Sequence, residues 1–264
     1  MAFQPQPDII EFYESQYVED ERLRRTPHGR LEFARTQELL RRFLPVAPAA
    51  VLDVGGGTGV HARWLAADGY AVRLLDPVAA HVAQAAQVPG VTAVLGDARE
   101  LDVATGSVDV VLLLGPLYHL PARDDRICAL TEARRVLRPD GLVIAAGISR
   151  YAGLLDYATQ GRLDTAALPA IRDVIATGRH DPRLGFTTAY CHLPDELAAE
   201  VGAAGFGPVD VYGVEGPLCA ALDVHGLNEV DAMLPAAIAC ARLVEREGPI
   251  IAASPHMLAV AARR

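Results

Sequence analysis

The chain has 264 residues, of which 33 are acidic, 24 are basic and 51% are hydrophobic, so its formal charge is −9. All 24 basic residues are arginine. Enzymes that need a lysine Schiff base and P-loop proteins that need a phosphate-binding lysine are therefore excluded. The negative charge disfavours nucleic acid as a partner, and no apolar stretch reaches the roughly 20 residues of a membrane span. Since the N-terminus lacks a signal pattern, we expect a cytoplasmic protein.

The first 48 residues are predicted to form a helical cap. Apolar residues recur at helical spacing between positions 8 and 44, with a break near Thr26-Pro27-His28-Gly29. Pro45 and Pro48 then end the cap. Tyr13 and Tyr17 lie about one helical turn apart, where they can either pack in the core or close over a ligand.

Residues 51–147 alternate between short apolar runs and helical segments. The strands are predicted at 51–54, 71–75, 91–95, 108–114 and 141–147, and the helices at 58–67, 78–87 and 123–137. This order is typical of βαβ units that build a parallel sheet.

The rest of the chain predicts a lid and two closing strands. Glycine and proline interrupt weak helical patterns over about 148–193, and a clear helix follows at 194–204. Strands at 209–214 and 257–262, with a helix around 228–246 between them, are expected to form an antiparallel pair at one edge. The predicted fold is α/β, a Rossmann-like doubly wound seven-stranded sheet with an antiparallel last strand. Its helical cap is residues 1–48, and the main domain is 49–264.

A glycine-rich turn follows the first predicted strand. Gly57-Thr58-Gly59-Val60-His61-Ala62 satisfies the G-x-G-x-x-A pattern of nicotinamide dinucleotide sites, where amides at a helix start hold a pyrophosphate. However, Asp53 ends the strand two residues before the first glycine and would repel a pyrophosphate. A cationic ligand fits this turn better, although an NAD-dependent oxidoreductase remains the alternative.

The ordered pattern Asp53-x-Gly55-x-Gly57-x-Gly59 resembles motif I of the class I S-adenosylmethionine-dependent methyltransferases. Their ligand carries a sulfonium and an ammonium but no phosphate. Asp76 ends the second predicted strand, where a carboxylate can accept hydrogen bonds from both ribose hydroxyls. The resemblance implies that Asp97 faces the adenine amino group and that the amide of Ala98 binds a ring nitrogen.

The resemblance also implies that Leu114, at the end of the fourth predicted strand, lies in the cofactor pocket. An arginine on the upstream helix is expected to bind the cofactor carboxylate, and either Arg30 or Arg35 could do so. The spacing does not choose between them.

The stretch Gly115–Pro121 resembles the corresponding loop of small-molecule methyltransferases of the glycine N-methyltransferase type. The resemblance therefore implies methyl transfer to oxygen, nitrogen or carbon of a small-molecule acceptor, with secondary metabolism as one setting. A non-catalytic S-adenosylmethionine-binding module is a further alternative. Homodimer formation is left open.

His119, in this loop, is the first candidate for a base or for a residue that orients the acceptor, because imidazole titrates near neutral pH. Tyr190 and His192, in the polar segment before the helix at 194–204, are further candidates. The remaining histidines lack metal-ligand spacing, so we predict no metal site.

Overall fold

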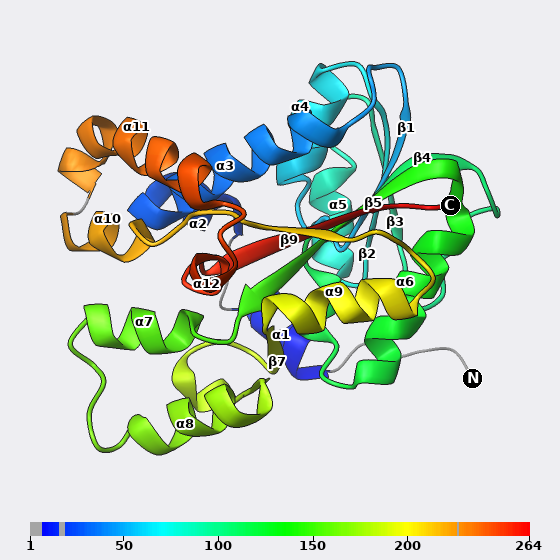
Figure 1. The fold of residues 1–264 in the computed structure, drawn as a ribbon. Helices are drawn as coiled ribbons and strands as arrows, with labels where there is room; N and C mark the ends of the chain where they lie inside the picture. Colours follow the sequence, from blue (N-terminus) through cyan, green and yellow to red (C-terminus); the bar gives the residue numbers. More distant parts are fainter. Residues whose placement is uncertain (1–6, 16–18, 226) are drawn as a thin grey trace.

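The computed structural model describes residues 7–15, 19–225 and 227–264, and Tyr17 lies outside them. Its centre is a mixed β-sheet with helices on both faces (Figure 1). Five parallel strands stand in the order β3-β2-β1-β4-β5. They are β1 (Ala50–Val54), β2 (Ala71–Asp76), β3 (Val91–Leu95), β4 (Val108–Leu113) and β5 (Leu137–Ser149). The parallel sheet predicted from the sequence is confirmed.

The two closing strands are also as predicted. β9 (His256–Ala262) pairs antiparallel with β5, and β8 (Asp210–Gly213) pairs antiparallel with β9. Because β9 runs against the parallel strands, its first residue lies at the edge where those strands end. The fold is the predicted Rossmann-like α/β sheet with an antiparallel last strand.

Helices cover both faces of the sheet, so both faces are buried. Successive side chains of a strand point to opposite faces and therefore pack into two different cores. On one face, Leu52, Val111 and Val143 pack beneath α6 (Arg123–Val136) and α9 (Pro194–Ala203). On the other face, Val110 and Ile144 belong to a second core that includes residues of α4 (Val60–Ala67) and α5 (Ala79–Ala85). This double burial explains the nearly continuous apolar runs in the sequence.

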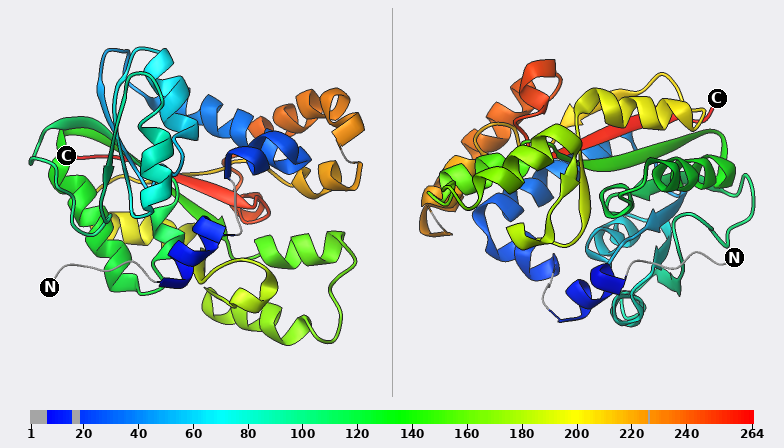
Figure 2. Two further views of the ribbon diagram at one scale, coloured as in Figure 1. Left: turned by 180° about the vertical axis from the view of Figure 1, so that it is seen from behind. Right: turned by 90° about the horizontal axis from the view of Figure 1, so that it is seen from below.

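The helical cap consists of α1 (Pro7–Ser15), α2 (Glu19–Arg25) and α3 (Pro27–Phe43). α3 begins at the predicted break, where the Thr26 hydroxyl accepts a hydrogen bond from the amide of Gly29. Leu31 of α3 packs in a small core with residues of α10 (Cys219–His225) and α11 (Leu227–Val244), so the cap and this late segment lie together (Figure 2). None of the helices in the described ranges is long and apolar enough to cross a membrane.

The segment predicted as a lid contains more structure than its sequence indicated. It forms α7 (Ala152–Thr159), α8 (Leu168–Thr177), β6 (Arg179–His180), a 3₁₀ turn at Pro182–Leu184 and β7 (Ala189–His192). β7 pairs in parallel with the end of β5, with Ile148 opposite Cys191, and β6 pairs with β7. Within the described ranges the sheet therefore has nine strands, two more than predicted. A four-residue strand gives too little alternation to be detected from sequence.

The boundary before β5 also differs from the prediction. The strand begins at Leu137 rather than at residue 141. Val108 of β4 pairs with Leu137 and Val110 pairs with Leu142, so the pairing of β4 with β5 shifts register and leaves a bulge at Arg138–Gly141. Asp140 has a φ of 62°, which accommodates the bend. The short helix α12 (Gly248–Ile251) then precedes β9.

Candidate active site

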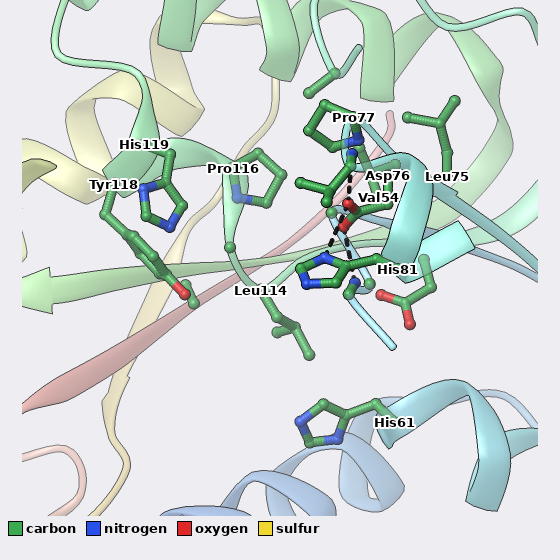
Figure 3. A pocket seen from close by; sticks show the side chains of 18 of the residues that line it. Val54, His61, Leu75, Asp76, Pro77, His81, Leu114, Pro116, Tyr118 and His119 are labelled. Carbon is green, nitrogen blue, oxygen red and sulfur yellow. Dashed lines mark hydrogen bonds and ion pairs between the residues drawn. The ribbon is translucent and has the colours of Figure 1, made fainter. Parts of the chain in front are cut away.

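A cavity lies at the carboxyl ends of the parallel strands and is partly covered by the cap. The loops after β1, β2, β3 and β4 form one part of its wall, and α1, α2, α3 and β9 form another. Figure 3 shows Tyr118 and His119 on one side of it, Asp76 and His81 on the other, and Leu114 and Pro116 between them. Of the predicted site residues, those that line the cavity are Asp53, Gly55, Gly57, Asp76, Asp97, Ala98, Leu114 and His119. The sequence therefore located most of its cofactor candidates at one place in the fold.

The glycine turn after β1 has a backbone that favours glycine. Gly55 and Gly57 have φ angles of 70° and 57°. A Cβ atom on Gly55 would come within 2.8 Å of the Pro116 ring, whereas one on Gly57 would meet nothing within 4 Å. The amide of Gly57 donates a hydrogen bond to Asp76 Oδ2 at 2.9 Å. Gly57 thus leaves backbone open to the cavity, while Gly55 lets the turn contact the loop after β4.

Asp53 is a buried carboxylate beside the cavity, and its side chain is unusually poor in partners. It is 1% exposed, and its Oδ2 atom has no hydrogen-bond partner in the described part of the chain. Burial and the nearby carboxylate of Asp76 raise the pKa of Asp53 to about 7. A ligand with positive charge would relieve this unfavourable arrangement, and a pyrophosphate would worsen it. The site therefore fits a sulfonium and ammonium ligand.

Asp76 is oriented by the turn that follows β2. Its Oδ1 atom accepts a hydrogen bond from the amide of Val78 at 2.9 Å and lies 3.2 Å from Nδ1 of His81. With Gly57 on Oδ2, the carboxylate is fixed at the cavity wall, and Oδ2 keeps a further lone pair.

Asp97, which follows β3, is held in a different way. The guanidinium of Arg99 binds both of its oxygens, with Nε at 2.9 Å and Nη2 at 2.8 Å. Arg99 also contacts Asp125, and all three residues line the cavity. Asp97 is thereby fixed in position next to Ala98.

The two arginine candidates lie elsewhere. Arg35 is fully buried and binds the carbonyl of Val214 and the carboxylate of Glu245, the latter at 2.5 Å. Arg30 pairs with Asp231 at 2.6 Å. Neither lines the cavity, so the structure gives no support to their assignment to the cofactor carboxylate. Gly59 also lies outside the lining and caps the start of α4.

Tyr190 and His192 belong to a buried network on β7 rather than to the cavity wall. The guanidinium of Arg126 binds both oxygens of Glu200, at 2.8 and 2.6 Å, and lies 3.7 Å from the ring centre of Tyr190. His192 Nε2 is 3.3 Å from Glu200 Oε2. The structure therefore brings these two candidates to a structural network and does not place them where an acceptor would bind.

His119 ends the 3₁₀ turn Pro116–His119 after β4 and lines the cavity. Its Nε2 atom is hydrogen-bonded to the hydroxyl of Tyr13 at 2.8 Å, and its ring packs against Phe186. Three segments far apart in sequence thus meet at this histidine: the cap, the loop after β4 and the lid. Of the two roles open to Tyr13, the structure favours the one at the ligand cavity.

Other cavity residues escaped the sequence analysis. Glu32 and His256 line the wall, and with Glu215 each offers one ligand atom within 4.8 Å of the others. These three residues are the one group in the described part of the chain with a geometry that could hold a metal ion, so the absence of a metal site stays a prediction. The position of His256 at the start of an antiparallel strand is the signal that could have revealed it.

Comparison with known proteins finds related methyltransferases. Residues 52–145 match the family model described as a methyltransferase domain. The ubiquinone/menaquinone biosynthesis C-methyltransferase UbiE of Acidiphilium cryptum is 28% identical over 194 residues, which cover 70% of this chain and 76% of that protein. The malonyl-[acyl-carrier protein] O-methyltransferase of Geobacter sulfurreducens is 33% identical over 174 residues, or 63% of this chain and 59% of that protein. The matched domain, these relatives and the fold together support a class I S-adenosylmethionine-dependent methyltransferase.

Solved structures show the same fold. A S-adenosylmethionine-dependent methyltransferase from Mesorhizobium loti has a TM-score of 0.59 at 19% identity, and the match covers 88% of this chain and 100% of that one. The cofactor of this methyltransferase is S-adenosylmethionine, so the nicotinamide alternative is set aside. The methyltransferase domain and the named methyltransferase relatives support an enzyme rather than a non-catalytic binding module.

Proposed function

We propose that this methyltransferase transfers a methyl group to a small, largely apolar acceptor held between the cap and the loop after β4. The observation that carries the proposal is that one cavity is lined by two kinds of residue. Carboxylates at the ends of β1, β2 and β3 line it in one part of the sequence, and apolar side chains of the cap, of the segment after β8 and of β9 line it in another; we assign the first set to a cofactor part of the cavity and the second set to an acceptor part. The apolar residues assigned to the acceptor part are Ile9 and Leu23 of the cap, Val214 directly after β8, and Leu258 of β9.

The first part is proposed to hold the cofactor, which supplies an electrophilic methyl group on its sulfonium. Asp53 offers a buried negative charge to the positively charged methionine portion, and Gly57 lets the backbone approach it. Asp76 is proposed to accept hydrogen bonds from the ribose hydroxyls. Asp97 and the amide of Ala98 are proposed to bind adenine, with Leu114 as an apolar wall.

Replacing Asp76 with alanine tests the cofactor site. We expect affinity for S-adenosylhomocysteine to fall by roughly 1.5–3 kcal/mol, because charge-assisted hydrogen bonds to the ribose are lost. Titration calorimetry measures the change. The Asp76→Asn variant keeps an oxygen acceptor for the amide of Gly57 and separates loop disruption from the loss of charge. Unchanged affinity in Asp76→Ala would remove the ribose role.

The second part of the cavity is proposed to orient the acceptor. Methyl transfer is an in-line displacement, so its main demand on the protein is to hold the acceptor atom about 3 Å from the methyl carbon, away from water. His119 and Tyr13 join the loop after β4 to α1 across the cavity and are suited to this task. Exclusion of water would depend on α1 staying in place.

His119→Ala is expected to lower turnover tenfold to about 10²-fold, because a displaced acceptor reacts more slowly. Tyr13→Phe removes the hydroxyl that binds His119 and should give part of the same loss. Transfer of radiolabelled methyl to phenols, hydroxy acids and amines identifies an acceptor and then measures turnover. Full turnover in His119→Ala would assign His119 to the scaffold.

A further inference from the structure

His81 is a buried polar side chain at the cofactor part of the cavity, and the proposed function gives it no role. It is the third residue of α5, which follows the turn after β2, and it is 7% exposed. Its imidazole lines the same cavity as Asp76, and Figure 3 shows the two side chains next to each other. The turn after β2 therefore presents two polar groups at the place proposed for the ribose.

The carboxylate of Asp76 has little hydrogen-bonding capacity left for a ligand. Its Oδ1 atom accepts a hydrogen bond from the amide of Val78 at 2.9 Å and lies 3.2 Å from Nδ1 of His81, so both lone pairs of Oδ1 are in use. Its Oδ2 atom accepts from the amide of Gly57 and keeps one lone pair. Asp76 can therefore accept one hydrogen bond from a bound ribose, whereas a ribose offers two neighbouring hydroxyls.

The contact with Asp76 determines which ring nitrogen of His81 carries a proton. Both oxygens of Asp76 already accept hydrogen bonds from backbone amides, so the carboxylate is an acceptor here and Nδ1 of His81 donates to it. In a neutral imidazole the other nitrogen, Nε2, is then a hydrogen-bond acceptor. The tautomer of His81 is thus set by a residue of the cofactor site.

The second ring nitrogen of His81 is available to a ligand. None of the residues that the structure describes is hydrogen-bonded to Nε2, and the ring lines the cavity. The ring of Tyr13 packs edge-on against the imidazole, with the ring centres 5.5 Å apart. Asp76 and Tyr13 together hold the imidazole at the cavity wall, so Nε2 is a fixed acceptor rather than a mobile one.

We propose that the two ribose hydroxyls of the cofactor are divided between Asp76 and His81. One hydroxyl donates a hydrogen bond to Oδ2 of Asp76, and the other donates to Nε2 of His81. This inference rests on the proposed function, in which the ribose lies at Asp76, and it narrows the role of that carboxylate to one hydroxyl. His81 is then a cofactor-binding residue that also orients Asp76.

This pair of acceptors suits two hydroxyls on adjacent carbons. Such hydroxyls need two acceptors that lie close together, and the hydrogen bond between Nδ1 of His81 and Oδ1 of Asp76 keeps the imidazole and the carboxylate side by side. A ribose bound in this way satisfies Nε2 and the remaining lone pair of Oδ2 at once. A ligand that lacks one hydroxyl leaves one acceptor unpaired in the cavity and should bind more weakly.

The first test compares S-adenosylhomocysteine with its 2′-deoxy and 3′-deoxy forms by titration calorimetry, at a pH above the ordinary titration range of histidine. The wild-type protein should bind both deoxy ligands more weakly than the parent. We expect a loss of about tenfold or more for the ligand without the hydroxyl that Asp76 binds, and of about threefold to tenfold for the other, because hydrogen bonds to charged groups are stronger. Equal affinity for the parent and either deoxy ligand would overturn the proposal.

The second test uses two substitutions that separate ligand binding from a purely structural role of His81. The amide of an asparagine reaches the place of Nδ1 and can still donate to Asp76, but it offers no acceptor where Nε2 stood. The amide of a glutamine reaches the place of Nε2 and can accept there. In His81→Asn the smaller of the two losses should shrink to less than about twofold while the larger one stays. In His81→Gln both losses should remain.

The pattern of affinities distinguishes this inference from the proposed function. If His81→Asn keeps both wild-type losses, or if the asparagine and glutamine variants give the same pattern, His81 only orients Asp76 and the division of the hydroxyls is overturned. If the wild type does not bind S-adenosylhomocysteine at all, the proposed function is overturned and this inference falls with it. The first test needs no variant, so the proposal can be overturned even if a substitution prevents folding.

Discussion

Replacing Glu200 with alanine is expected to lower the free energy of unfolding by about 3–5 kcal/mol, because the substitution leaves a buried arginine without its counterion. Arg126 is 1% exposed, and Glu200 binds its guanidinium through two hydrogen bonds. The same carboxylate contacts His192. One truncation therefore removes the anion from a network that joins α6, β7 and α9.

Urea unfolding at neutral pH measures this loss. The matched control is Asp181→Ala, which removes the acid from an arginine pair at the surface, where Arg183 is 87% exposed. We expect a much smaller loss there, because solvent screens the exposed ion pair and the substitution otherwise removes only the cap of the 3₁₀ turn Pro182–Leu184. Equal effects of the two substitutions would show that the buried network does not stabilise the fold.

The network also predicts the direction of acid sensitivity. Burial raises the pKa of Glu200, but Arg126 and His192 outweigh it, and the pKa falls from 4.5 to about 2. A carboxyl with a depressed pKa contributes stability above its unfolded pKa and loses it as the pH falls toward the folded value. The difference in stability between wild type and Glu200→Ala should therefore shrink between pH 4.5 and pH 2.

Affinity for S-adenosylhomocysteine is expected to rise with pH, by about 50-fold between pH 5 and pH 7. The pKa of Asp53 is raised to about 7 by burial and by Asp76, so the carboxyl is mostly protonated at pH 5. If the ammonium of the ligand binds the ionised carboxylate, a proton must leave Asp53 on binding. One released proton gives a slope close to tenfold per pH unit below the pKa.

Calorimetry across this pH range checks the expectation, and Asp53→Asn is the control. The amide keeps the size of the side chain but cannot titrate, so its affinity should be low and independent of pH. A wild-type affinity that does not change with pH would show that Asp53 stays away from the ligand charge. A slope that persists in Asp53→Asn would assign the titration to another group.

The cofactor half of the site was largely predictable because its residues are close in sequence to the strands that position them. Asp53, Asp76 and Asp97 each follow or end a parallel strand, and the ends of parallel strands meet at one edge of the sheet. The glycine turn could also be predicted, since its residues are contiguous and three of its glycines adopt positive φ angles. In these cases local order along the chain is enough to predict proximity.

Roles that depend on long-range packing were beyond sequence reasoning. Arg35 looked like a cofactor ligand, but folding brings Glu245 and Val214 to it from the other end of the chain. Tyr190 and His192 looked like an active-site cluster until β7 aligned with β5 and placed them beside Arg126 and Glu200. Apart from Glu200, which is eight residues from His192, each partner lies tens of residues or more away, so no spacing rule reports it.

Sequence alone determined the α/β order, the glycine turn and the carboxylates of the cofactor half, because periodicity and chain-local geometry encode them. Only the tertiary structure decided which residues complete the acceptor half. His256 comes from the last strand, Glu32 from the cap and His119 from the loop after β4, and they border one cavity because the sheet order and the packing of the cap bring them there. Such proximity is a property of the packed fold, in which burial of the apolar faces fixes the elements against one another.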